Sequence, residues 1–499
     1  MLFSKLSSIG AERRNRVGNS GENSPVMILE DGETWSLESL LVHARRVAAG
    51  LSAVGIESGD RVVLHMGNGP AIAIAYLACF CIGAVAAPLN LRFKQIELED
   101  VVLRLQPKAY IGDAHRIGPL VSYLKHNVAE TRRFVVGTTS LIATASWASL
   151  VKHESITRIP RVDGLAPAVL LTTSGTTGKP KFVAHSQSTL LEGASRMTTL
   201  TDGGRLAFFL PMVHSSGLTV FVSAFLSSTS LMMMDGTDVN KILDGIERYM
   251  CTTLLTFPLI MAQLVACQRA NGRDLSSMRL FATGGDACHP RIREAFEKTV
   301  GIPLRSIWAS TEGVGSLGFS SGSLPAYRPM PGVETRLVGH DGNLAICGET
   351  GELLIRGPHV ALGYWEASDI TGFPDGWYPT GDVMRENESG DFEFVSRLKD
   401  LIVRAGSNIS PVEIEQVILS HPNVVDAGVV GAPDIELGQR VLGFVQLSAN
   451  INANGLDEIR GFIRNRLAEY KVPDQLIPLQ QIPRNALGKV DRTALLKMM

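Results

Sequence analysis

The chain has 499 residues, more than one hydrophobic core usually organises and enough for about three units of ~150 residues. Hydrophobic residues make up 45% and charged residues 19%, a globular balance that excludes a disordered or collagen-like chain. The 47 basic and 49 acidic side chains leave a net charge of −2, so the sequence lacks the strong positive field of a nonspecific nucleic-acid binder. We therefore expect no nucleic-acid partner.

The cysteines and the uncharged segments indicate the compartment. The six cysteines include no CxxC pair and fit reduced thiols better than a disulfide framework. The N-terminus lacks the continuous apolar stretch of a secretory signal. The uncharged run 71–89 approaches the length of a membrane-spanning helix, but Gly83 and Pro88 interrupt it, and we interpret it as a buried helix over 72–82 followed by a strand. The sequence predicts a cytoplasmic protein without a membrane span.

The order of apolar runs along the chain predicts its organisation. Up to residue 160, and again after residue 165, strand-like runs alternate with helical stretches, which is typical of a parallel sheet with crossover helices. From about 332 to 394, short strands separated by Gly, Pro and Asp turns indicate a small antiparallel barrel or sandwich. The pattern of the last hundred residues or so predicts a separate α+β unit, joined to the preceding residues at Lys399–Asp400.

The clearest motif is TTSGTTGKPK at 172–181, directly after the apolar run 168–171. Its backbone N–H groups, hydroxyls and lysines can surround phosphates, and each hydrogen bond to a charged group contributes roughly 1.5–3 kcal/mol. It is not a Walker A loop, because Gly175 and Gly178 lie too close together and Pro180 stands where that motif needs Ser or Thr. A polar hairpin is the alternative, but it leaves the paired lysines unexplained.

This segment resembles the phosphate loop of the adenylate-forming (AMP-binding) superfamily, which comprises acyl- and aryl-CoA synthetases, peptide-synthetase adenylation domains and luciferases. Further motifs of the family follow in the expected order, so the resemblance spans about residues 30–495. It implies an α/β fold with a large N-terminal domain, 1–399, of two parallel sheets flanked by helices plus a small β-barrel. A smaller, mobile α+β C-terminal domain, 400–499, would act as a lid.

The resemblance also implies a nucleotide site. WASTE at 308–312 is similar to the family's aromatic-x-x-Thr-Glu motif, although many members have Tyr and Gly at its first two positions. In that motif Glu312 would hold Mg²⁺, Thr311 would reach the α-phosphate and Trp308 would stack on adenine. The implied ATP-binding residues are Thr173, Ser174, Gly175, Thr176, Thr177, Gly178, Lys179, Lys181, Gly285, Asp286, Trp308, Thr311, Asp382 and Arg397.

The remaining motifs resemble segments that contact the ribose and the acyl group in the family. YPTGD at 378–382 and RLKD at 397–400 resemble the segments whose Asp and Arg contact the ribose, here Asp382 and Arg397. The turn at 284–287 resembles the one beneath the adenine and acyl group, with an atypical Asp286 after its glycines. Gly284 and His214 are the implied residues of the acyl pocket, although a buried core histidine is the alternative for His214.

Three residues belong to the implied lid. Asp400 would be the hinge, and Gly406 would leave room for the thiol arm. Lys489 lies in PRNALGKVD, which resembles the family's catalytic loop. A cation is needed there because a carboxylate must approach a phosphate, and Lys489 can stabilise the charge that develops in the transition state. The implied catalytic residues are Lys489, Thr311 and Glu312.

These motifs together predict a ligase that uses ATP and Mg²⁺ to convert a carboxylic acid to acyl-AMP and then transfers the acyl group to a thiol, preferably coenzyme A. The apolar segments 218–225 and 256–261 favour a monocarboxylate. The sequence has no Asp near His214 that could hold an α-amino group, which argues against an α-amino acid as the substrate. Asp286 leaves an amino-bearing acid open beside aliphatic and aryl acids. A stand-alone enzyme that loads an acyl carrier protein, a non-catalytic nucleotide-binding protein and a phosphotransferase remain alternatives.

Overall fold

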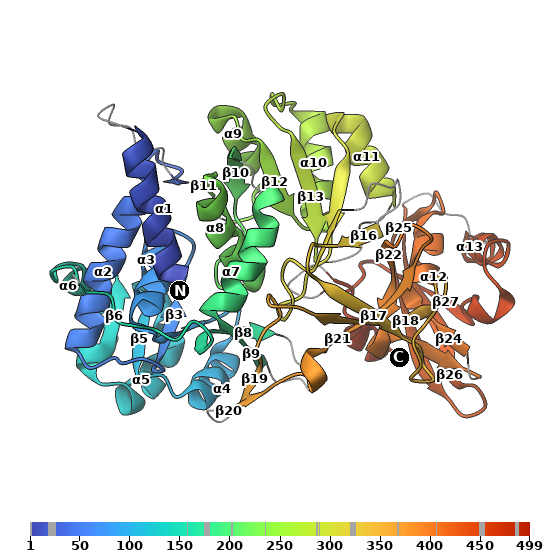
Figure 1. The fold of residues 1–499 in the computed structure, drawn as a ribbon. Coiled ribbons are helices and arrows are strands. Elements are labelled where there is room, and N and C mark those ends of the chain that lie inside the picture. The colour runs from blue at the N-terminus through green and yellow to red at the C-terminus, as the bar shows by residue number, and fades with distance from the viewer. Residues whose placement is uncertain are drawn as a thin grey trace.

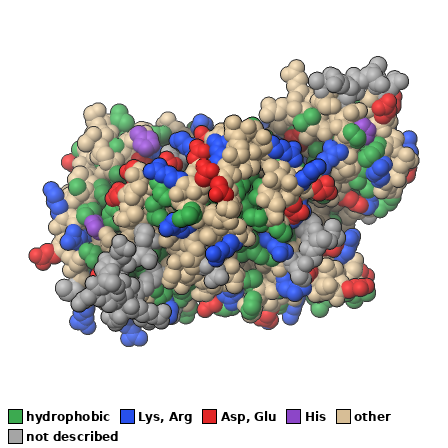
Figure 2. All heavy atoms as spheres, turned by 90° about the horizontal axis from the view of Figure 1, so that it is seen from above, with side chains coloured by type: hydrophobic (Ala, Val, Ile, Leu, Met, Phe, Trp, Pro, Cys, Tyr) green, Lys and Arg blue, Asp and Glu red, His purple; other side chains and the backbone are tan. Residues whose placement is uncertain are grey.

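The strands of the described part of the chain form four sheets, with the N-terminal elements at one end of the molecule and the C-terminal ones at the other (Figure 1). Acidic and basic side chains are interspersed on the face shown in Figure 2, as the near-neutral net charge of −2 suggests. The computed structural model describes residues 2–17 (side chains to residue 10 only), 26–156, 158–173, 180–200, 203–234, 236–285, 288, 290–319, 326–366, 369–405, 407–448, 455–484 and 489–499.

The first sheet has the strand order β20-β19-β9-β8-β4-β3-β5-β6-β7. Its neighbours from β8 to β7 are parallel, as the alternation of strands and helices predicted, whereas β9, β19 and β20 pair antiparallel at the other edge. The strands are β3 (Arg61–His65), β4 (Val85–Pro88), β5 (Ala109–Asp113), β6 (Arg133–Val136), β7 (Ala145–Ser146), β8 (Pro167–Thr173), β9 (Lys181–Ser186), β19 (Gly363–Glu366) and β20 (Asp369–Thr371).

The uncharged run is a buried helix and strand, as predicted. Helix α3 (Pro70–Ile82) is buried from Ile72 to its end, stops at Gly83 in a left-handed conformation with φ 77°, and is followed by β4. None of the helices that the structure describes has the length and apolar character needed to cross a membrane. The other helices here are α1 (Leu2–Val17), α2 (Leu37–Ala53), α4 (Gln95–Leu105), α5 (Val121–Asn127) and α6 (Trp147–Val151).

The second sheet has the order β14-β13-β12-β10-β11-β1-β2 and is parallel except for its β1–β2 edge. One hydrophobic core joins it to the first sheet through α3 and α8. Its elements are β1 (Met27–Ile28), β2 (Thr34–Trp35), β10 (Arg205–Phe208), β11 (Ser230–Met233), β12 (Thr253–Thr256), β13 (Leu280–Gly284), β14 (Leu304–Ile307), α7 (Gln187–Arg196), α8 (Ser215–Ser227), α9 (Val239–Tyr249), α10 (Pro258–Ala270) and α11 (Pro290–Val300).

The third sheet is antiparallel, in the order β15-β16-β22-β21-β18-β17, and corresponds to the predicted small barrel. Strands β19 and β20 lie within the same stretch of sequence but join the first sheet instead. The strands are β15 (Leu317–Phe319), β16 (Ala326–Pro329), β17 (Glu334–Val338), β18 (Thr350–Arg356), β21 (Tyr378–Glu386) and β22 (Phe392–Arg397).

The C-terminal residues form an α+β unit, as predicted. Its sheet has the order β24-β23-β26-β25, with β27 parallel to β26. It contacts the rest of the chain where Ser410 Oγ donates to the Val395 carbonyl at 2.7 Å and where Arg291 on α11 donates to the His421 carbonyl. The elements are β23 (Ile402–Arg404), β24 (Ser407–Ile409), β25 (Val424–Asp434), β26 (Gly438–Leu447), β27 (Gln475–Leu479), α12 (Pro411–Leu419), α13 (Gly455–Arg464) and α14 (Arg492–Leu496).

Candidate active site

The predicted phosphate loop connects two antiparallel strands. Strand β8 ends at Thr173 and β9 begins at Lys181, and these two residues are paired in register. The hairpin therefore holds both ends of the loop at one place. The side-chain oxygen of the adjacent Thr172 is buried without a hydrogen-bond partner among the described residues. Six predicted loop residues lie outside the described residues, namely Ser174, Gly175, Thr176, Thr177, Gly178 and Lys179.

Glu312 is held by two tyrosine hydroxyls. Its side chain is 8% exposed, and its Oε1 and Oε2 accept hydrogen bonds from Tyr364 at 2.9 Å and Tyr378 at 3.0 Å. Burial, followed by the charge of Glu312, raises the pKa of both phenols, so both remain protonated donors at neutral pH. Because Tyr364 lies on β19 and Tyr378 on β21, the first and third sheets together orient this carboxylate.

Lys181 links the phosphate loop to this carboxylate. Its Nζ lies 4.6 Å from the centre of the Tyr364 ring, within the range of a cation–π contact. The same tyrosine donates to Glu312. The structure therefore brings one end of the predicted phosphate loop beside the predicted magnesium ligand, although 131 residues separate them in sequence.

Thr311 is fixed through both its backbone and its side chain. The Thr311 carbonyl accepts a hydrogen bond from His185 Nε2 at 2.8 Å, and its Oγ1 accepts one from Ser215 Oγ at 3.4 Å. Burial lowers the pKa of His185 to about 4, so the ring is neutral at pH 7. Since a carbonyl only accepts, the proton of the neutral ring is on Nε2. His214 directly precedes Ser215 and caps α8, and burial lowers its pKa as well.

The low pKa of His185 predicts acid sensitivity. Between pH 6.5 and about 4 the unfolded chain binds a proton at this histidine that the folded chain does not, so the free energy of unfolding should fall as pH falls through that window. The contribution is at most about 1.4 kcal/mol per pH unit. In His185→Gln, whose amide can still donate to Thr311, the dependence on pH should be shallower. Urea unfolding at pH 7, 6 and 5 measures both slopes, and equal slopes would contradict this assignment.

Asp382 is almost fully buried, at 1% exposed, and pairs with two predicted site residues. Its Oδ2 accepts a hydrogen bond from Trp308 Nε1 at 2.7 Å, and its Oδ1 lies 2.7 Å from Arg397 Nε. Burial raises the pKa of Asp382, and the neighbouring Arg397, Trp308 and Lys489 act in the opposite direction. The contact between Trp308 and Asp382 was not foreseen from the sequence. Stacking of Trp308 on adenine stays a prediction.

The C-terminal unit brings a cation to this carboxylate. Lys489 lies close enough to Asp382 for its charge to lower the pKa of that carboxyl group, whereas Asp400 raises it. The Asp400 carboxylate is 3.8 Å from Nη1 of Arg492, whose Nη2 donates to Glu415 Oε1 at 2.8 Å. The predicted hinge residue is therefore tied to α14 in this arrangement. Gly406, the predicted residue of the thiol channel, lies outside the described residues.

Two glycines end β13 where backbone and side chains crowd. A Cβ at Gly284 would lie 2.9 Å from the Ile307 carbonyl oxygen. Gly285 has φ +80°, and a Cβ there would lie 3.2 Å from the Phe257 ring. Gly284 is therefore favoured by the close approach of the Ile307 backbone, and Gly285 by its left-handed φ. Asp286, the next predicted site residue, lies outside the described residues.

Three residues that orient the site were missed by the sequence analysis. Tyr364 and Tyr378 hold Glu312, and His185 holds Thr311. Tyr378 stands at the start of the YPTGD motif, so its position in a motif was a signal that was available. His185 and Tyr364 lie in strands whose pairing brings them to the site, and nothing in the neighbouring sequence marks them.

Comparison with known proteins identifies the family of this chain. The family of AMP-binding enzymes matches residues 14–365, and the AMP-binding enzyme C-terminal domain matches residues 413–489. A medium-chain fatty-acid–CoA ligase of Escherichia coli (strain K12) is 30% identical over 490 residues, covering 93% of this chain and 86% of that protein. An indoleacetate–CoA ligase of Aromatoleum aromaticum (strain DSM 19018 / LMG 30748 / EbN1) is 29% identical over 471 residues, covering 89% of each. The crystal structure of ATP-bound MatB from Rhodopseudomonas palustris superposes with a TM-score of 0.87 at 25% identity, covering 100% of this chain and 98% of that one.

Proposed function

Because the chain belongs to the family of AMP-binding enzymes, we propose that it joins a carboxylic acid to a thiol through an acyl-AMP intermediate, with coenzyme A as the thiol. The observation that carries this proposal is the buried Glu312, oriented by two phenols, one of which, Tyr364, also contacts Lys181 at the end of the phosphate loop. Lys489 lies within electrostatic range of Asp382, which accepts a hydrogen bond from Trp308.

The first step places two negative groups in contact. A carboxylate oxygen of the acid forms a bond to the α-phosphorus of ATP, the bond from that phosphorus to the bridging oxygen breaks, and pyrophosphate leaves. In this proposal Thr173 and Lys181 hold the triphosphate. Thr311 and Lys489 stabilise the charge that develops on the α-phosphate, and Asp382 with Arg397 holds the ribose.

Glu312 fits the requirements of a magnesium ligand. Carboxylate oxygens are the hard ligands that Mg²⁺ prefers, and each Glu312 oxygen keeps acceptor capacity beyond the one phenol it receives. Magnesium bound here would neutralise charge on the phosphates as pyrophosphate departs. The two tyrosines keep the carboxylate oriented, so little reorganisation is needed when the nucleotide enters.

The second step releases AMP. The thiol loses its proton, its sulfur bonds to the acyl carbon, and the bond from that carbon to the AMP oxygen breaks. We propose that the C-terminal domain, 400–499, rotates about Asp400 between the steps, which withdraws Lys489 and brings Gly406 to the thiol. Both this domain boundary and a cytoplasmic location, where ATP and coenzyme A are supplied, are part of the proposal.

The acid is proposed to be a monocarboxylate with an apolar body. Helix α8 is buried from Gly217 to Phe225, and Ile260 and Met261 on α10 are buried as well. Two of the relatives are named for a medium-chain fatty acid and for indoleacetate, which both have this character. An acyl carrier protein remains the alternative acceptor.

A panel of carboxylic acids tests the proposal. With each acid we would measure pyrophosphate release and identify the nucleotide product, with and without coenzyme A. We expect AMP and pyrophosphate with apolar monocarboxylates, and a thioester when coenzyme A is present. ADP as product would establish a phosphotransferase instead. If the reaction goes to completion only when an acyl carrier protein is added, the acceptor of the acyl group is that protein and not coenzyme A.

Replacing the hinge tests the rotation. Proline fixes φ and removes a backbone donor, so Asp400→Pro should slow thioester formation more than acyl-AMP formation. Because Asp400 also pairs with Arg492, the variant Asp400→Asn serves as a control that loses the charge and keeps the backbone freedom. Single-turnover measurements of both half-reactions would show the difference. Unchanged overall turnover in Asp400→Pro would count against a hinge at this position.

A further inference from the structure

A cavity of about 850 Å³ lies outside the candidate active site, among α2, α3 and α6. Figure 1 places α2 and α6 at one end of the molecule, opposite α12 and α13 of the C-terminal unit. That unit carries Lys489, which lies near Asp382. None of the residues that line the cavity is one of the predicted site residues, so the cavity is separate from the candidate active site.

One wall of the cavity is apolar and aromatic. Trp35 and Trp147 line it together with the first turns of α3, from Pro70 to Ile74. The Trp35 ring meets His43 edge to face, with ring centres 5.1 Å apart. His43 Nδ1 is 2.8 Å from the Ser39 carbonyl, which fixes the imidazole in the wall. Such a wall suits a flat or short apolar group.

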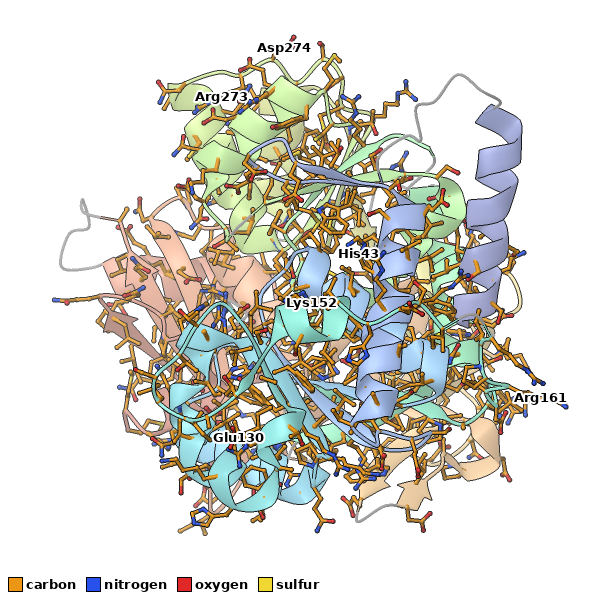
Figure 3. The ribbon with its side chains drawn as sticks, turned by 90° about the vertical axis from the view of Figure 1, so that its left-hand side faces the viewer. His43, Glu130, Lys152, Arg161, Arg273 and Asp274 are labelled. Carbon is orange, nitrogen blue, oxygen red and sulfur yellow. The ribbon has the colours of Figure 1, made fainter. Side chains whose placement is uncertain are left out.

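Charged side chains also line the cavity. Exposed Arg46 on α2 and Lys152 after α6 are its cations, with His153 and Glu154 beside Lys152. In the described part of the chain, neither the Arg46 nor the Lys152 side chain forms a hydrogen bond or ion pair. Figure 3 shows Lys152 close to His43, so the cation lies beside the aromatic wall. Two cations without protein partners beside an apolar wall are suited to an anion.

We propose that this cavity is a binding site for a small organic anion with an aromatic or short apolar body, such as an aryl carboxylate or sulfonate. The indoles would contact the body, and Arg46 and Lys152 would contact the anionic group. This inference does not rest on the proposed function, because it concerns residues outside the nucleotide site.

The probe is anilinonaphthalene sulfonate, an aryl anion that fluoresces when it enters an apolar site. Binding to the full chain would be measured with and without saturating ATP and magnesium, so that the nucleotide site is filled in one arm. We expect saturable binding, with energy transfer from tryptophan to the probe. Loss of binding when the nucleotide is present would place the probe in the active site and overturn the proposal.

Variants assign the site. Arg46→Ala with Lys152→Ala should raise the dissociation constant at least about tenfold, the change expected from losing one hydrogen bond to a charged group. Lys125→Ala, an exposed lysine of the same region, is the matched control and should change nothing. Trp147→Phe should reduce the energy transfer and keep binding. Unchanged affinity in the double variant, or unchanged transfer in Trp147→Phe, would contradict the site. A thermal unfolding midpoint equal to the parent's would verify that the variants are folded.

Discussion

Replacing Lys489 with alanine should lower the rate of acyl-AMP formation by ~10²–10³, which is typical for the loss of one group that stabilises developing charge. The structure places this lysine within electrostatic range of Asp382, the predicted ribose ligand. The carboxylate of the acid and the α-phosphate would then repel each other without a compensating cation. Thioester formation from supplied acyl-AMP should stay close to the parent rate, because in the proposed rotation the lysine is withdrawn before that step.

The matched control is Lys497→Ala, an exposed lysine of the same unit. Its acyl-AMP formation should equal that of the parent. Pyrophosphate release measures the first half-reaction, and thioester produced from synthetic acyl-AMP measures the second. An equal loss of both half-reactions in Lys489→Ala would refute the role assigned to it.

Replacing Glu312 with glutamine should reduce pyrophosphate release by about 10²-fold or more and raise the magnesium concentration needed for half-maximal rate. The amide keeps the shape of the side chain but removes the negative charge and one acceptor oxygen, so one of the two phenols loses its partner. Tyr364→Phe should have a smaller effect of the same kind, since it removes one orienting hydrogen bond and keeps the carboxylate.

Titration of magnesium at fixed ATP separates these variants. Glu388→Gln, at an exposed turn, is the control for loss of a carboxylate. Thermal unfolding of each variant would show whether the buried site still packs. A magnesium dependence in Glu312→Gln identical to that of the parent would mean that this carboxylate does not hold the metal.

Much of the fold could be predicted from local sequence. The strands β3, β5 and β6 are short apolar runs between helical stretches, and a parallel sheet buried on both faces requires such runs. Gly83 and Pro88 interrupt an uncharged run of membrane-spanning length, which predicted a buried helix followed by a strand. The structure confirms this prediction. The strand before the phosphate loop was predicted, but β9 after it was not, and the pairing of β8 with β9 forms the hairpin that the sequence analysis had kept only as an alternative.

The contacts that orient the site could not be predicted in the same way. Strand β19 lies within the stretch predicted to form the small barrel, but it pairs with β9 of the first sheet and so carries Tyr364 to Glu312. The hydrogen bond between Trp308 and Asp382 joins residues 74 positions apart. Both depend on which strands pair over long distances, and local patterns of apolar residues do not determine that.

The most direct measurement follows oxygen from the acid to the nucleotide. The acid that gives the highest turnover would be supplied with oxygen-18 in both carboxylate positions, together with ATP, magnesium and the thiol. If a carboxylate oxygen attacks the α-phosphorus and the thiol later displaces AMP, each AMP should carry one labelled oxygen and the thioester should keep the other. Unlabelled AMP, or ADP as the product, would contradict the acyl-AMP intermediate.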